Sequence, residues 1–189
     1  MASFIVEGGH RLSGTITPQG AKNEALQILC ATLLTSEEVV VDNIPDILDV
    51  NNLIQLLAES GVEVNKLSPN KYSFKAKELN ENFLASQEYL LRCRSLRGSI
   101  MLTGPLLARL GRAVIPQPGG DKIGRRKLDT HFLGMRKLGA ELHYNDQTGA
   151  CEIVADKLAG TYILLDEASV TGTANVVMAA VLAEGKTTI

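Results

Sequence analysis

The sequence predicts an α/β domain made of repeated modules, in each of which a helix, a strand, a second helix and a β-hairpin follow one another. Two observations predict it. The order of these four patterns occurs twice and begins a third time. In addition, two helical segments are apolar on nearly every side, which is typical of helices enclosed by sheets. We expect modules at about 21–78, 89–158 and 161–189, the third of them truncated, after a strand segment at 1–20.

The first module is predicted from four successive patterns. An apolar helix, "AKNEALQILCATLL", precedes the β-branched strand "EVVVDNI", and a second helix, "DILDVNNLIQLLAESG", follows Pro45. Asp46 is a suitable N-cap for the second helix, and Gly61 is a suitable stop at its C-terminal end. The hairpin consists of "VEVNKL", the turn "SPN" and "KYSFKA", in which Tyr72 and Phe74 alternate on one face.

The second module repeats this order. Its helix is "SLRGSIMLTGPLLARLG", its strand "RAVIP", its second helix "LDTHFLGMRKLG" and its hairpin "AELHYNDQTGACEIVA". The third begins with "TYILLDEASVTGTANVVMAAVLAEG" and reaches only the start of a strand, "KTTI". Equivalent leucines, Leu34, Leu107 and Leu182, close the first helix of each module. The chain therefore resembles part of a longer protein.

Composition excludes several classes of protein. The 189 residues carry a formal net charge of -2 and a pI near 5.9, which argues against a nucleic-acid-binding protein. No apolar run approaches the ~20 residues of a membrane-spanning helix, and no secretion signal is visible at the start. Three widely spaced cysteines without metal spacing suit partly buried thiols in a reducing compartment. We therefore expect a cytoplasmic protein that binds neither nucleic acid nor membrane.

The first candidate site is "QGAKNEAL". Lys22 and Asn23 fall in the first turn of a predicted helix, directly after Gly20. Unpaired backbone N–H groups and the helix dipole favour an anion at that place, and the lysine adds a full positive charge. An ordinary solvated lysine in a first helical turn is the alternative interpretation.

The second candidate site is "RCRSLRGSIM", in which three arginines precede an apolar helix. The planar guanidinium group suits phosphate or carboxylate recognition. Arg97 is closest to the apolar run, so we expect it to point inward. For Arg92 and Arg94 we expect a solvated position on the shoulder of the helix.

The third candidate site is the loop "PGGDKIGRRKLDTH", residues 118–131. Its glycines permit backbone conformations that expose N–H groups, and its cations add to the positive field. These residues are Gly119, Gly120 and Gly124 with Lys122, Arg125, Arg126 and Lys127. A phosphorylated small molecule is the natural ligand. A nucleic-acid patch is the rival interpretation, which the acidic pI disfavours.

Asp121 and the histidines differ from these cations. A carboxylic acid can protonate a reacting carbon if its pKa rises towards neutrality. The neighbouring cations lower the pKa of Asp121 and a bound phosphate raises it, so we expect a competent acid only when the anionic substrate is bound. His131 is a candidate for ordering the loop, whereas His10 and His143 lie in strand-like segments and suit surface positions.

In this order, the three segments resemble those of the enolpyruvyl transferases. The resemblance covers essentially the whole chain and rests on "GAKNEAL", "LRGSIMLTGPLLARLG", "PGGDKIGRRKLDTHFLGMRKLGA" and "ASVTGTANVVMAAVLAEGKTTI". "GAKN", where the shikimate-pathway enzymes would show "GDKS", favours the cell-wall branch of the family. The resemblance implies an inside-out α/β fold with internal helices, and a reaction without metal or cofactor. That reaction moves the enolpyruvyl group of phosphoenolpyruvate to the 3-hydroxyl of UDP-N-acetylglucosamine through a tetrahedral adduct, and releases phosphate as peptidoglycan synthesis begins.

The resemblance also implies roles for individual residues. Asp121 would be the proton donor, with Lys22 and Arg126 as further catalytic residues, and Lys22 and Asn23 would bind phosphoenolpyruvate. The nucleotide sugar would be bound by Arg97, Arg126, Lys127, Leu128, Asp129, Thr130, Ser169 and Val170.

Four positions depart from the common family pattern. Asp121 stands where the family usually has the cysteine that the antibiotic fosfomycin alkylates, so we expect resistance to that drug. Lys127 replaces a frequent proline, Glu167 replaces a frequent lysine, and Thr171 replaces a frequent glycine.

The length of the chain is the largest departure. Family enzymes have two three-module domains, with the active site between them, and their first strand, here about 1–20, belongs to the other domain. We therefore expect the carboxyl-terminal half of the enzyme as a partner, and little activity from this chain alone. Two alternatives stay open: a shikimate-type enolpyruvyl transferase, and a non-catalytic module that binds a nucleotide sugar.

Overall fold

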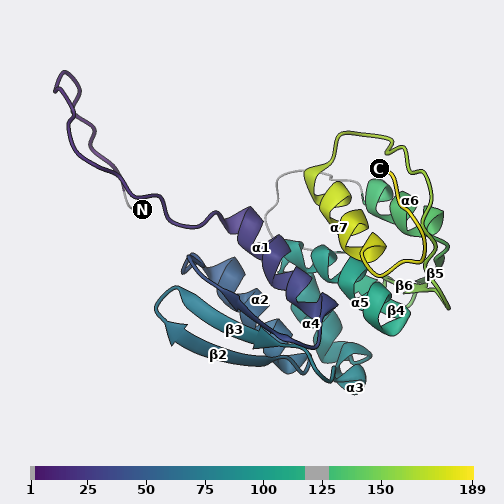
Figure 1. Ribbon diagram of the computed structural model, residues 1–189. Helices are drawn as coiled ribbons and strands as arrows, with labels where there is room; N and C mark the ends of the chain where they lie inside the picture. Colours follow the sequence, from purple (N-terminus) through teal and green to yellow (C-terminus); the bar gives the residue numbers. More distant parts are fainter. Residues whose placement is uncertain (1–2, 118–127) are drawn as a thin grey trace.

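Two three-stranded antiparallel sheets lie on the outside of a layer of helices in the computed structural model, which describes residues 3–117 and 128–189 (Figure 1). The first sheet has the strand order β1-β3-β2 and the second the order β4-β6-β5. Each middle strand is thus the last of its unit in the sequence. The two units share one element order and one sheet order, as the repeated sequence pattern predicts.

The first unit follows the predicted sequence of elements. It consists of α1 (Lys22–Ala31), the 3₁₀ turn η1 (Thr32–Leu34), β1 (Glu38–Val41), α2 (Leu48–Glu59), β2 (Glu63–Ser68) and β3 (Lys71–Lys75). Gly61 follows α2 with φ of 98°, and its N–H donates to Ala58 O, so it ends the helix as expected. The prediction for Asp46 is wrong, because α2 starts after Ile47 and has no side-chain cap. Asp46 instead accepts a hydrogen bond from Asn51 Nδ2 at 2.7 Å.

The second unit has a more irregular first helix than its sequence predicts. It contains η2 (Arg97–Leu102), α5 (Thr103–Leu110), β4 (Arg112–Pro116), α6 (Asp129–Lys137), β5 (Glu141–Asn145) and β6 (Ala150–Val154). Before it lie two short helices that the sequence patterns did not predict, α3 (Glu81–Leu84) and α4 (Gln87–Ser95). Asn80 and Ser86 cap them by accepting hydrogen bonds from Phe83 N and Tyr89 N.

The third segment forms a helix between two short extended pieces. Isolated parallel bridges join Ala159 to Glu184 and Tyr162 to Thr188, and α7 (Val170–Ala180) lies between them in the sequence. Extended chain, helix and parallel extended chain make a βαβ-type connection, which is consistent with the start of a third module.

Helices α1, α5 and α7 lie in the interior and run in the same direction in Figure 1. Helix α5 packs against α7 and η1, and α1 packs against η2 and α7. The core includes Leu29 and Cys30 of α1, Leu107 of α5 and Ala179 of α7, each at most 1% exposed. The expected arrangement of helices inside and sheets outside is therefore present.

The prediction that α1 and α7 are buried on all faces is wrong. Ile28 of α1 is 46% exposed, and Val177 and Val181, at the C-terminal end of α7, are 45% and 60% exposed. The apolar pattern covers these faces too, but among the described residues no element packs over them.

The predicted strand at 1–20 is also not formed within residues 3–20. These residues have no regular secondary structure, and Phe4, Val6 and Ile16 are each at least 87% exposed. Figure 1 shows the segment extending away from the rest of the chain. A strand requires a neighbour for its backbone hydrogen bonds, and the described residues provide none there.

Candidate functional site

The N-terminal end of α1 carries the first predicted site. Lys22 is the first residue of the helix, and its Nζ lies 2.8 Å from Asp49 Oδ2 in the first turn of α2. No side chain caps α1. Gly20 N donates to Asn43 Oδ1 at 3.1 Å, and a Cβ on Gly20 would lie 1.9 Å from the Asn43 carbonyl oxygen. The glycine therefore permits the close approach that sets where α1 begins.

All three arginines of the second site are half-buried, as expected for Arg97 but not for the other two. Arg97 is half-buried at the start of η2, next to Gly98, whose missing Cβ would lie 2.9 Å from Leu26 Cδ1 of α1. Arg92 is not simply solvated, because its Nη2 is 2.8 Å from Glu59 Oε1. Arg94 donates to the Thr148 carbonyl. Arg92 and Arg94 thus hold neighbouring elements together, and Arg97 remains the candidate for ligand binding.

Of the third site, Leu128, Asp129 and Thr130 lie at the start of α6. Leu128 is half-buried and precedes the helix, Asp129 is exposed in its first turn, and Thr130 is 1% exposed. Thr130 Oγ1 donates to Asp166 Oδ1 at 2.7 Å, and Glu167 Oε1 is 3.3 Å away. The predicted contact residue Thr130 is therefore engaged with an acidic pair.

The N-terminal end of α7 lies against the same part of α6. Ser169 caps α7, since its Oγ accepts from Gly172 N at 3.1 Å, while Val170 is 78% exposed. A Cβ on Gly172 would lie 2.8 Å from Thr130 Cγ2. The small residue at position 172 allows this close contact between the two predicted segments.

A buried polar network lies beneath these helix ends. His131 is 3% exposed and Asn175 is completely buried. Asn175 Nδ2 is 3.0 Å from His131 Nδ1, and Thr171 Oγ1 is 3.4 Å from His131 Nε2. Burial and, to a smaller extent, the positive charge of Arg97 lower the pKa of His131 to about 4. Asn175 Nδ2 also donates to Ile100 O of η2 at 2.9 Å, so η2 and the start of α6 lie close together.

The structure thus brings most of the predicted site residues with described positions to one region. Arg97, Thr130, Ser169 and Val170 belong to segments linked through His131, Asn175 and Gly172. Lys22 and Asn23 begin α1, which packs against η2 and α7. Asp121, Arg126 and Lys127 lie outside the described residues, so the predictions for them stay predictions.

The predicted site residues did not include two residues that organise this region. Asp49, the partner of Lys22, had no distinguishing signal, because an acidic residue is common in a first helical turn. Asn175 did have a distinguishing signal in the sequence, because it is the polar residue inside the apolar stretch "ANVVMAAVLA". A buried amide in such a helix needs hydrogen-bond partners and therefore marks a network.

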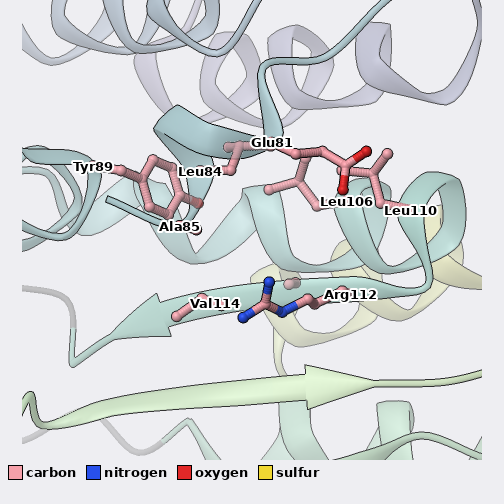
Figure 2. A pocket seen from close by; sticks show the side chains of 9 residues that line it. Glu81, Leu84, Ala85, Tyr89, Leu106, Leu110, Arg112 and Val114 are labelled. Carbon is pink, nitrogen blue, oxygen red and sulfur yellow. The ribbon is translucent and has the colours of Figure 1, made fainter. Parts of the chain in front are cut away.

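Two hollows in the described part of the chain are lined by other residues. A cavity of about 30 Å³ lies between α3, α4, α5 and β4, and Figure 2 shows Glu81 and Arg112 on opposite sides of it. That volume suits a water molecule, not a nucleotide sugar. A wider hollow of about 950 Å³ lies at the C-terminal ends of α5 and α7, between Leu110, Lys157 and Glu184.

Two searches of the described residues bear on other classes of site. Within 3–117 and 128–189, no three His, Cys, Asp or Glu side chains are grouped so that they could hold a metal ion. Of the helices in these ranges, none has the length and apolar character needed to cross a membrane. All three cysteines are buried free thiols, and burial raises the pKa of Cys93 to about 11.

Comparison with curated proteins gives close relatives over the full chain. The chain is 66% identical over 189 residues to UDP-N-acetylglucosamine 1-carboxyvinyltransferase of Bacteroides thetaiotaomicron, covering all of this chain and 44% of the relative. It is 58% identical to the enzyme of the same name from Porphyromonas gingivalis, with the same coverage. The chain therefore spans less than half the length of these relatives.

Solved structures show the same fold at much lower identity. The enolpyruvyl transferase NikO from Streptomyces tendae has a TM-score of 0.74 at 19% identity, over 95% of this chain and 41% of that chain. An EPSP synthase from Acinetobacter baumannii has a TM-score of 0.68 at 20% identity, over 92% and 39%. The α/β fold predicted from the repeated modules is thus confirmed as that of the enolpyruvyl transferases.

The family model described as EPSP synthase (3-phosphoshikimate 1-carboxyvinyltransferase) matches residues 6–189. This match includes both repeated units, α7 and all segments that carry the predicted site. The chain therefore belongs to the EPSP synthase family, as its resemblance to the enolpyruvyl transferases predicted.

Proposed function

We propose that this chain is part of an enzyme that transfers the enolpyruvyl group of phosphoenolpyruvate to the 3-hydroxyl of UDP-N-acetylglucosamine and releases phosphate. The observation that carries the proposal is the 66% identity, over the whole chain, to a protein named UDP-N-acetylglucosamine 1-carboxyvinyltransferase. Such a reaction serves peptidoglycan synthesis in the bacterial cytoplasm. It needs two anionic substrates to be held side by side, and two cationic candidates with described positions, Lys22 and Arg97, begin elements that pack against each other, α1 and η2.

In the proposed reaction, an acid protonates the methylene carbon of phosphoenolpyruvate while the sugar hydroxyl attacks the adjacent carbon. The resulting tetrahedral adduct loses phosphate and a proton, and the enol ether forms. We assign the proton transfer to Asp121, and the phosphate and carboxylate of phosphoenolpyruvate to Lys22, Asn23 and Arg126. The place of Lys22 in the uncapped first turn of α1 supports this assignment, since backbone N–H groups there favour an anion.

We assign the nucleotide sugar to the region where η2, α6 and α7 meet. Arg97 is half-buried there, and an arginine held in a partly desolvated position binds phosphate more strongly than one in bulk water. The other residues proposed to bind the nucleotide sugar are Lys127, Leu128, Asp129, Thr130, Ser169 and Val170. Glu167 contributes negative charge beside Thr130, so we expect it to restrict where the diphosphate can lie.

The missing parts of the site are proposed to come from a carboxyl-terminal half. The relatives are more than twice as long as this chain, and the segment 3–20 exposes apolar residues such as Phe4 and Ile16. We propose that this segment pairs with the second domain of the whole enzyme, and that residues 21–189 form part of the first. The base that activates the sugar hydroxyl would then lie in the second domain.

A shikimate-type activity is the second candidate, because the matching family model is described by 3-phosphoshikimate 1-carboxyvinyltransferase. The two activities differ in the acceptor: one is a nucleotide sugar and the other a phosphorylated cyclic acid. The segment "GAKN" and the names of the relatives with 58% and 66% identity favour the nucleotide sugar.

Isothermal titration of the chain with UDP-N-acetylglucosamine and, separately, with shikimate 3-phosphate distinguishes the two candidates. We expect binding of the nucleotide sugar alone, and a loss of affinity in Arg97→Met. Mixing the chain with the carboxyl-terminal part of the Bacteroides thetaiotaomicron relative tests the complete reaction through phosphate release. Binding of shikimate 3-phosphate alone contradicts the proposal, and nucleotide-sugar binding without activity in the mixture favours a non-catalytic module.

A further inference from the structure

Asn175 joins three elements from inside the core. Its Oδ1 accepts from Gly104 N of α5 at 2.8 Å, and its Nδ2 donates to Ile100 O of η2 at 2.9 Å. The same Nδ2 lies 3.0 Å from His131 Nδ1 of α6. A Cβ on Gly104 would lie 2.6 Å from Asn175 Oδ1, so the glycine makes this approach possible. All hydrogen-bonding groups of the buried amide are therefore used between elements.

These contacts determine how the amide and the imidazole are oriented. A backbone N–H can only donate, so the oxygen of Asn175 must face Gly104. The two hydrogens of Nδ2 then point to Ile100 O and to His131 Nδ1. His131 Nδ1 must accept, and a neutral ring then carries its hydrogen on Nε2. Hydrogen bonding across the core thereby selects one tautomer.

The selected tautomer points towards Thr171. His131 Nε2 lies 3.4 Å from Thr171 Oγ1, and with its hydrogen on Nε2 the ring donates to this oxygen. No other partner of the Thr171 hydroxyl occurs among the described residues. The hydroxyl hydrogen is therefore available to an acceptor on the outer side, where Thr171 is exposed in the first turn of α7.

We propose that the Thr171 hydroxyl donates a hydrogen bond to a diphosphate oxygen of the nucleotide sugar, and that Asn175 and His131 are positioning residues that keep it a donor. This inference rests on the proposed function. Two features make an anionic oxygen the fitting acceptor. Thr171 lies in the first turn of α7, where backbone N–H groups and the helix dipole favour negative charge, and the positive charge of Arg97 acts on the His131 ring.

The tautomer is tested without any ligand, by two-bond ¹H–¹⁵N NMR correlation on the imidazole nitrogens of the 189-residue chain. We expect the hydrogen of His131 on Nε2. In Asn175→Asp, a carboxylate oxygen faces Nδ1 and attracts a proton to it, so we expect a changed ring pattern. If the unaltered chain carries the hydrogen on Nδ1, the positioning role of Asn175 and His131 is wrong, whatever the affinity for ligand.

The contact to ligand is tested by titration with UDP-N-acetylglucosamine. We expect Thr171→Val to weaken binding about tenfold, as for loss of a hydrogen bond to a charged group, and Thr171→Ser to bind within about twofold of the unaltered chain. Thr173→Val is the matched control: it removes a hydroxyl two residues further along α7, one that donates to Ser169 O at 2.7 Å. Unchanged affinity in Thr171→Val overturns the contact.

A double-mutant cycle separates positioning from general destabilisation. Asn175→Asp weakens binding in the unaltered background but adds nothing once Thr171→Val is present, because the hydroxyl to be oriented is gone. His131→Asn gives the same result if Asn175→Asp does not fold, as it retains an acceptor towards Asn175 and loses the Nε2 donor. Additive effects on affinity overturn the positioning role. Absence of nucleotide-sugar binding by the unaltered chain overturns the proposed substrate and the Thr171 contact, while the NMR result still decides the tautomer.

Discussion

Lys22 Nζ lies 2.8 Å from Asp49 Oδ2, an ion pair that joins the N-terminal ends of α1 and α2. The two side chains are 37% and 39% exposed, so the pair is neither buried nor fully solvated. A carboxylate in this place competes with any phosphate for the same ammonium group. Asp49 therefore has two opposing effects, because it holds Lys22 in place and also reduces the positive potential at the predicted site.

The first prediction follows from this competition. In Asp49→Asn, we expect the affinity for phosphoenolpyruvate to increase severalfold at low salt, and the free energy of unfolding to fall by less than about 1 kcal/mol. Calorimetric titration and urea denaturation measure the two quantities. Asp46→Asn is the control, since Asp46 is also acidic and near the start of α2 but contacts Asn51. Weaker binding in Asp49→Asn would mean that its orienting effect dominates.

The second prediction concerns acid stability. His131 has a pKa of about 4 in the folded chain, whereas a histidine in an unfolded chain has a pKa near 6.5. Between these values the unfolded chain binds the proton and the folded chain does not. The free energy of unfolding should therefore fall as the pH is lowered from about 6.5 to about 4, by up to roughly 3 kcal/mol.

Urea denaturation at a series of pH values checks this prediction. Asn175 and Thr171, whose side chains face the ring, carry no titrating group, and the contribution of His131 is the part of the slope that His131→Asn removes. His131→Asn should show a shallower dependence on pH, whereas His10→Asn should retain that of the unaltered chain because His10 is exposed. Equal slopes in all three proteins would show that the pKa of His131 is the same in the folded and the unfolded chain, which contradicts the prediction.

The third prediction tests the contact between α6 and α7. A Cβ on Gly134 would lie 2.0 Å from Val176 Cγ2, and Val176 is completely buried. We expect Gly134→Ala to lower the free energy of unfolding by about 1 to 3 kcal/mol, because the added methyl group overpacks the core. Thermal denaturation measures this loss of stability. Adding Val176→Ala should recover part of the loss, and Gly8→Ala, with nothing within 4 Å, should be neutral.

The fourth prediction concerns fosfomycin and rests on the place of Asp121 in the sequence. In the full-length protein with UDP-N-acetylglucosamine present, we expect no covalent adduct by intact-mass spectrometry, because a carboxylate is a weaker nucleophile than a thiolate. When treated with fosfomycin, Asp121→Cys should gain one adduct and lose its activity. The buried thiols of Cys30, Cys93 and Cys151 should stay unmodified in both proteins. An adduct on Asp121 would contradict the prediction.

The sequence by itself determined the repeated order of elements and the segments that carry the site. Helical spacing in α2 and the stop at Gly61 are local properties, and both appear in the structure. Phe74 is buried as its strand pattern predicts, although its neighbour Ser73 is buried too. The nearness of Arg97 to an apolar run also predicted its partial burial, although Arg92 is half-buried as well.

Tertiary structure alone decided which residues meet. The pairing of Lys22 with Asp49, and of Asn175 with His131, joins positions far apart in the chain, and neither periodicity nor composition contains that information. The same holds for residues 3–20 and for the exposed side of α7: an extended segment becomes a strand, and an apolar face becomes buried, only where another element supplies hydrogen bonds or surface. Such partners are properties of the assembled fold, because local sequence sets the preference of a segment and its neighbours in space decide whether that preference is realised.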